Sequence, residues 1–107
     1  MEARRYKRII VTLQAELIAG DSRYACFIEN LSEEGAYITI AKTNPQADFD
    51  PDTPFELKFR FPSGEKLNLS CRVKWSYRTP PHGYTNSVGL EIMDPPPLYT
   101  EVLKALQ

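Results

Sequence analysis

Hydrophobic and polar residues alternate along much of this chain, as in strands with one face in a core and the other in water. The alternation is unbroken from Phe55 to Phe61, and a second unbroken run extends from Leu67 to Tyr77. Pro62–Glu65, between the two runs, contains the residues of a turn. We therefore predict a hairpin here, with Trp75 and Tyr77 on its core-facing side.

Four further strands are predicted by shorter runs rich in apolar and β-branched residues. They cover residues 10–19, 23–29, 35–40 and 88–92. Gly20–Ser22 forms a turn that joins the first two into a hairpin. The segments 41–54 and 78–86 carry several prolines and no apolar period, so we expect loops there. Six such strands predict an all-β fold, a six-stranded antiparallel barrel.

The chain closes with a predicted helix. Asp94–Pro97 ends the last strand, because three successive prolines cannot donate to a sheet. Apolar residues at helical spacing follow, namely Leu98, Val102, Leu103 and Leu106. We expect the helix to cover an end of the barrel rather than to dimerise. The whole of 1–107 then forms a single domain with a flexible arm over 1–8, a barrel over 9–93 and a terminal helix over 97–106.

Overall charge gives the molecule no bias towards nucleic acid or acidic lipid, because the formal net charge is -1. A local excess of positive charge stands at the start, where Arg4, Arg5, Lys7 and Arg8 face Glu2 alone. The apolar segment that follows, residues 9–11, is too short for a signal peptide or a membrane span. We therefore expect a cytoplasmic protein without membrane insertion, whose anion site is local.

Few residues suit catalysis or metal binding. Cys26 and Cys71 lie in apolar runs without C-x-x-C spacing, which predicts buried reduced thiols. His82 is the single histidine and lies in a proline-rich loop, so neither a metal cage nor a catalytic triad can be built on it. The alternating aspartates of 48–52 lack the glycine and glutamate of a calcium loop. We expect no enzymatic activity, cofactor or metal.

Two short motifs carry the candidate chemistry. Arg4 and Arg8 fit R-x-x-x-R, while Asn30, Ser32 and Gly35 fit [DN]-x-S-x-x-G. The chain resembles the PilZ domain family in the order and rough separation of these motifs. The resemblance implies a small β-barrel that binds the bacterial second messenger cyclic di-GMP.

The residue types suit such a ligand. An arginine can pair bidentately with guanine N7 and O6 or with phosphate oxygens, and its planar face can stack on a purine. Short Asn and Ser side chains carry oxygens that can accept from the guanine Watson–Crick edge or bind phosphate. Glycine permits a positive φ or a close approach in the turn between strands.

The resemblance also assigns roles. It implies a ligand site formed by Arg4, Arg5, Arg8, Asn30, Ser32 and Gly35. Arg4 and Arg8 would clamp guanine and phosphate, with Arg5 adding only charge, and the ligand often binds such domains as an intercalated pair. Because only residues 1–3 precede Arg4, we expect the arm to order on binding at some cost in affinity.

We expect a non-catalytic receptor or adaptor that signals by ordering its arm and engaging an unidentified effector protein, in control of motility, polysaccharide or biofilm. The alternative is a PilZ-like protein-interaction module with weak or no nucleotide binding. A barrel that binds single-stranded nucleic acid is disfavoured by the net charge and by the lack of a second basic cluster. The expected oligomeric state is a monomer or weak dimer.

Overall fold

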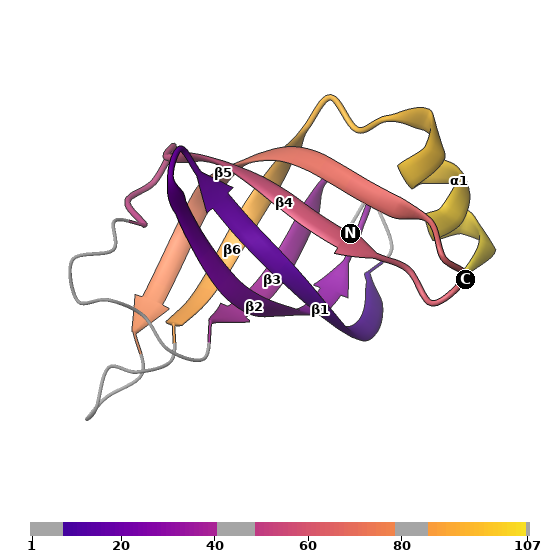
Figure 1. Ribbon diagram of the computed structural model, residues 1–107, viewed down its shortest axis with the longest axis horizontal. Helices are drawn as coiled ribbons and strands as arrows, with labels where there is room; N and C mark the ends of the chain where they lie inside the picture. The colour runs from indigo at the N-terminus through magenta and orange to yellow at the C-terminus, as the bar shows by residue number, and fades with distance from the viewer. Residues whose placement is uncertain (1–7, 41–48, 79–85, 107) are drawn as a thin grey trace, which may run out of the picture.

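Six strands form a closed antiparallel barrel in the computed structural model, which describes residues 8–40, 49–78 and 86–106 (Figure 1). The elements are β1 (Ile9–Ala19), β2 (Ser22–Leu31), β3 (Gly35–Ile40), β4 (Pro54–Arg60), β5 (Lys66–Arg78), β6 (Asn86–Met93) and α1 (Pro97–Ala105). Around the barrel the order is β1-β2-β3-β6-β5-β4, and every neighbouring pair is antiparallel. The predicted six-stranded barrel with a terminal helix is therefore confirmed.

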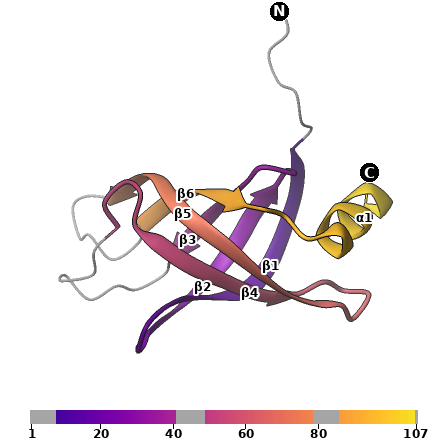
Figure 2. The same cartoon turned by 90° about the horizontal axis from the view of Figure 1, so that it is seen from above.

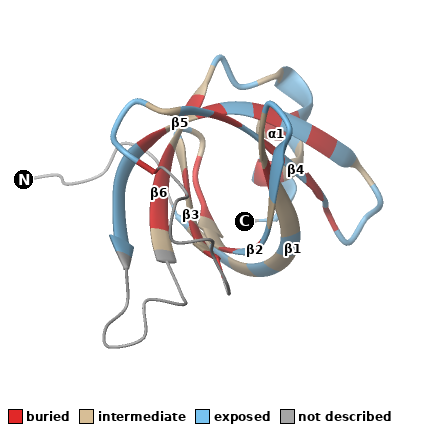
Figure 3. Ribbon diagram, turned by 60° about the vertical axis from the view of Figure 1, so that its left-hand side comes forward, coloured by how far each residue is buried: buried red, intermediate tan, exposed pale blue. Residues whose placement is uncertain are grey.

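The barrel interior is filled by one apolar core. Along β4, buried Phe55, Leu57 and Phe59 alternate with exposed residues, as their period of two predicts. Figure 3 shows the same change between buried and exposed positions along the strands. Burying one such side chain contributes about 1.5–3 kcal/mol, so the alternation itself fixes which face of each strand points inward.

A β-bulge in β5 reverses part of the predicted pattern. Val73 pairs with Leu90, but the next pair joins Trp75 to Gly89, so that β5 contains one extra residue. An extra residue turns the side chains beyond it to the opposite face. Trp75 is 47% exposed and Tyr77 is 58% exposed. The prediction that these two aromatic residues lie in the core is therefore wrong.

The segment before β4 adds an aromatic side chain to the core. Phe49 is buried, and its ring centroid lies 5.4 Å from that of Tyr24 and 5.6 Å from that of Phe55. The sequence pattern indicated only a loop here, because Phe49 stands alone among polar residues. The other parts of the predicted loops, 41–48 and 79–85, lie outside the described residues.

Helix α1 lies against one end of the barrel (Figure 1 and Figure 2), as expected for a cap. Tyr99 and Leu103 are its fully buried side chains, whereas Leu98 and Leu106 are each 42% exposed. The prediction that Leu98 and Leu106 lie on the buried face of the helix is therefore wrong, whereas Leu103 is buried as predicted. The buried face instead contains Tyr99, which the apolar pattern did not include. None of the helices within the described ranges is long and apolar enough to cross a membrane.

The two cysteines are free and buried, as predicted. Burial raises the pKa of the Cys26 thiol to about 12, with a smaller effect of the Glu16 carboxylate in the same direction. Burial alone raises the pKa of Cys71 to about 12. Both side chains therefore remain protonated at neutral pH and act as small apolar residues.

Substitutions of two neighbouring residues on β4, one on the inner face and one on the outer face, should have very different effects on the free energy of unfolding. Leu57 is fully buried and Lys58 is exposed. Leu57→Ala should lower the free energy of unfolding by about 2–5 kcal/mol, because it leaves a cavity in the barrel. Lys58→Ala should change it by less than about 0.5 kcal/mol. Urea denaturation measures both values, and equal losses in the two variants would contradict the assignment of faces.

Candidate functional site

The two sequence motifs meet at the start of β1. Arg8 directly precedes this strand, and Ile10, two positions further on, pairs with Asn30 of β2. The side chain of Arg8 therefore lies beside Asn30. The Arg8 Nη1 group donates a hydrogen bond to Asn30 Oδ1 at 2.6 Å, although the residues are 22 positions apart. The structure thus joins one arginine of the first motif to the second motif. Arg4 and Arg5 lie outside the described residues.

The second motif forms the tight connection between β2 and β3. The Ser32 amide donates to the Gly35 carbonyl at 2.9 Å, and the Gly35 amide donates to Ser32 Oγ at 3.2 Å. Ser32 is buried, so its oxygen first serves to close the turn. A serine hydroxyl also carries a proton, and the bond accepted by Ser32 Oγ does not use it.

Gly35 is needed because of its neighbour on β6. A Cβ at this position would lie 3.0 Å from the Leu90 carbonyl oxygen, which belongs to the backbone and cannot easily move. Positive φ is not the reason, since Gly35 does not have one. The close approach found here is that of the β6 backbone, whereas the sequence had suggested a positive φ or room beside a ligand.

The strand register aligns one residue from each of five strands on the outer face of the barrel, next to the turn. A row of paired residues runs from β1 to β5 through Ile10, Asn30, Tyr37, Gly89 and Trp75. The rings of Tyr37 and Trp75 have centroids 5.6 Å apart. An aromatic surface therefore adjoins the polar turn, and such a surface can stack on a nucleobase.

Trp75 and Tyr37 are the site residues that sequence reasoning missed. The alternation along β5 predicts Trp75 in the core, and Tyr37 fits neither motif. Gly89 is the one available signal for this face, because a glycine inside a strand often marks a close approach by another group. A Cβ on Gly89 would lie 2.3 Å from Trp75 Cε2 and Nε1, so the indole occupies the place of that missing side chain.

A small polar hollow lies where the turn and the aromatic row meet. It has a volume of about 120 Å³ and is lined by Arg8, Ser32, Glu34, Gly35, Ala36, Tyr37, Lys74, Trp75, Gly89 and Leu90. Pockets that enclose a ligand usually measure about 300–1,000 Å³. The hollow alone is therefore too small to enclose a ligand as large as a dinucleotide.

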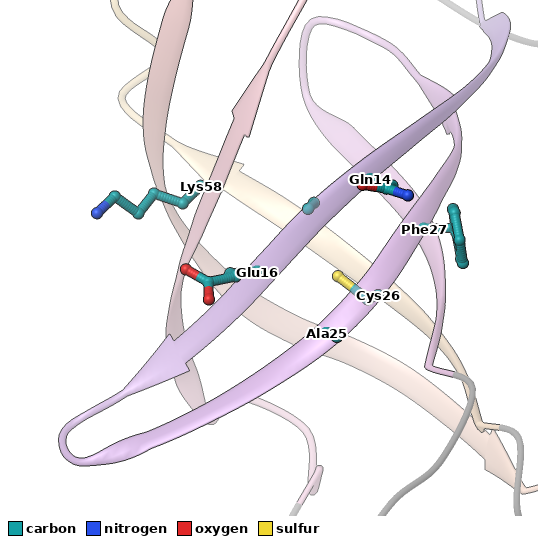
Figure 4. Close-up of a pocket in the computed structure, with 7 residues that line it drawn as sticks. Gln14, Glu16, Ala25, Cys26, Phe27 and Lys58 are labelled. Atoms are coloured by element: carbon teal, nitrogen blue, oxygen red, sulfur yellow. The ribbon is translucent and has the colours of Figure 1, made fainter.

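A second, larger hollow of about 480 Å³ lies on β1, β2 and β4 (Figure 4). Its lining is mostly apolar, and Glu16 pairs in register with Lys58 at its rim. The opposite charges of these two residues give no excess of cations for a phosphate. Among the motif residues that the structure describes, none lines this hollow, which is therefore separate from the turn of the second motif.

Residues that could hold a metal do not gather in the described part of the chain. No group of three or more His, Cys, Asp or Glu side chains is found in residues 8–40, 49–78 and 86–106. His82 lies outside these ranges.

Comparison with known families identifies the family of this chain. The model of the PilZ domain matches residues 2–106, which is nearly the whole chain. The chain belongs to the PilZ domain family. Among curated protein sequences, none matches it.

Two solved structures share the fold of this chain. The inhibitor of motility MotI from Bacillus subtilis superposes with a TM-score of 0.78 at 16% identity, over 96% of this chain and 48% of MotI. This PilZ chain therefore spans about half the length of MotI. The PilZ domain of YcgR from Escherichia coli, solved with c-di-GMP, superposes with a TM-score of 0.75 at 15% identity, over 96% of this chain and 87% of that one. At these identities the similarity establishes the fold.

Replacement of Gly89 should disturb the aromatic surface of this PilZ domain while leaving the barrel folded. The added Cβ in Gly89→Ala would overlap the indole of Trp75, which is half-exposed and free to swing away. Fluorescence of this single tryptophan should shift to longer wavelength as the ring enters water. The thermal unfolding midpoint should move by only a few degrees.

Ser70→Ala is the control for this prediction, because Ser70 is an exposed residue of β5 outside the site. Its emission spectrum should match that of the wild type. An unchanged spectrum in Gly89→Ala would show that the indole does not lie on Gly89.

Proposed function

We propose that this chain is a receptor for cyclic di-GMP that binds the ligand between its N-terminal arginines and the turn of the second motif. The hydrogen bond from Arg8 to Asn30 is the observation that carries the proposal, because it joins one residue from each motif. Membership of the PilZ family and the c-di-GMP bound to the similar YcgR domain support it.

The chemistry of the site suits a dinucleotide with two phosphodiesters. Arg8 and Lys74 supply positive charge at the hollow, and the arginine can also pair with guanine. Tyr37 and Trp75 offer aromatic faces on which a guanine can stack. Ser32 offers its hydroxyl proton to a phosphate or carbonyl oxygen.

Arg4 and Arg5 complete the site in this proposal. The hollow is too small to enclose a dinucleotide, so a cover is needed on the solvent side. Residues 1–8 supply it as an arm that orders over the ligand, and 9–93 and 97–106 act as the barrel and terminal helix of one domain.

The proposed output is binding of an effector protein in the cytoplasm, without catalysis. A ligand shifts a partner equilibrium only through a state that the partner binds differently, and ordering of the arm creates such a state. The similar protein MotI is described as an inhibitor of motility. Motility is therefore the first process in which to seek the effector, with polysaccharide and biofilm control as the other candidates.

A PilZ-like protein-interaction module with weak or no nucleotide binding is the second candidate. The observation that favours it is the exposure of apolar side chains on the barrel surface, with Ile10 86% exposed and Phe27 39% exposed. Such residues often mark protein contacts. This candidate predicts a partner that binds equally with and without cyclic di-GMP.

Calorimetric titration with cyclic di-GMP tests the receptor proposal. Arg8→Ala should weaken binding by roughly tenfold or more, because one bidentate arginine contact contributes about 1–3 kcal/mol. The unfolding midpoint of the free protein should stay nearly unchanged, since Arg8 is exposed.

Arg23→Ala is the matched control. Arg23 is an exposed arginine whose side chain pairs with Glu16 at 3.3 Å on another part of β1 and β2. Its loss removes the same charge without touching the site, so affinity should remain that of the wild type. Equal affinity of wild type and Arg8→Ala, or equal losses in both variants, would overturn the assignment. Absence of binding to the wild type would leave the interaction module as the better function.

A further inference from the structure

Tyr99 links the terminal helix to the turn of the second motif. Its side chain is fully buried, and its hydroxyl donates a hydrogen bond to the Ser32 carbonyl oxygen at 2.6 Å. The two residues are 67 positions apart in the sequence. Burial, with smaller effects of Cys71 and Glu33, raises the pKa of the Tyr99 phenol, so the group keeps its proton for this bond.

The turn has a second anchor, which comes from β6. The Ile92 amide of β6 donates to the Glu34 carbonyl oxygen at 2.8 Å. Between these anchors, the Ser32 and Gly35 groups bond to one another. Because a carbonyl is coplanar with the amide that follows it, the Tyr99 bond fixes the peptide plane leading out of Ser32. The orientation of the turn therefore depends on where α1 lies.

The hydroxyl is the part of Tyr99 that packing does not explain. Tyr99 and Leu103 both belong to the apolar core, and a phenylalanine would fill nearly the same volume. A buried polar group requires a partner, and here the partner is the backbone of the binding motif.

We propose that Tyr99 is a positioning residue for the ligand site, through which docking of α1 and occupation of the motif turn stabilise each other. This inference rests on the proposed function and adds to it a route from the site to the helix. Coupling between two sites is reciprocal, so a ligand that selects the bonded geometry of the turn must also favour the docked helix.

Hydrogen exchange in the ligand-free protein tests the positioning role alone. In Tyr99→Phe, the amides of Ser32 and Gly35 should exchange roughly tenfold faster, because the turn loses one of its anchors. Tyr24→Phe is the matched control, since it removes the same atom from a tyrosine that packs on Phe49 and Phe55. Unchanged exchange in Tyr99→Phe, or equal acceleration in both variants, would overturn the proposal.

Titration with cyclic di-GMP tests the coupling. Tyr99→Phe should bind roughly three- to tenfold more weakly, the value expected for one net hydrogen bond. In the wild type, the ligand should slow amide exchange in residues 100–105 of α1, and this effect should be lost in the variant. Equal affinity in both proteins, or faster exchange of α1 on binding, would overturn the coupling.

Leu57→Ala separates positioning from general stability. It weakens the core more than Tyr99→Phe but leaves the hydroxyl and its acceptor intact, so its affinity should equal that of the wild type. An equal loss of affinity in both variants would show that stability controls binding, which contradicts the proposal. If the wild type does not bind cyclic di-GMP, the receptor function fails. Exchange in the free protein then still decides whether Tyr99 positions the turn.

Discussion

The hydrogen-bonded turn from Ser32 to Gly35 is the constraint on which the proposed site depends. It reverses the chain within a few residues, and it is closed by one backbone bond and one bond to the Ser32 hydroxyl, both between Ser32 and Gly35 of the motif. Gly35 lets the turn approach the backbone of β6, where any Cβ would meet the Leu90 carbonyl. Ser32 and Gly35, which the motif predicts to be ligand-binding residues, are therefore also required for the shape of the turn.

Strand register extends this surface beyond the motif. Pairing places Asn30, Tyr37 and Gly89 in one row, and the bulge in β5 turns Trp75 onto the end of that row. Without the bulge, the indole would point into the core as the alternation of its strand predicts. A single extra residue in one strand thus turns an apolar core position into an exposed aromatic position beside a polar turn.

The sequence predicted the barrel because its strands each have one buried face, which imposes a period of two that is visible locally. It also predicted that Arg8 and Asn30 belong to one site, since both fit recognisable motifs. It failed for Trp75 and for the exact helix face, because a bulge and the docking of α1 depend on pairing between distant residues. The contact of Tyr99 with Ser32 spans 67 positions and leaves no local pattern. The ligand-binding roles of the six predicted site residues remain predictions, namely those of Arg4, Arg5, Arg8, Asn30, Ser32 and Gly35.

The crystal structure of the chain bound to cyclic di-GMP tests the central claim most directly, namely that arginine and motif turn act on one ligand. We expect a guanine or phosphate in contact with the Arg8 guanidinium and within reach of Asn30 and Ser32, with a purine ring against Trp75. A ligand bound elsewhere, for example in the hollow beside Gln14 and Phe27, without contact to Arg8, would contradict it.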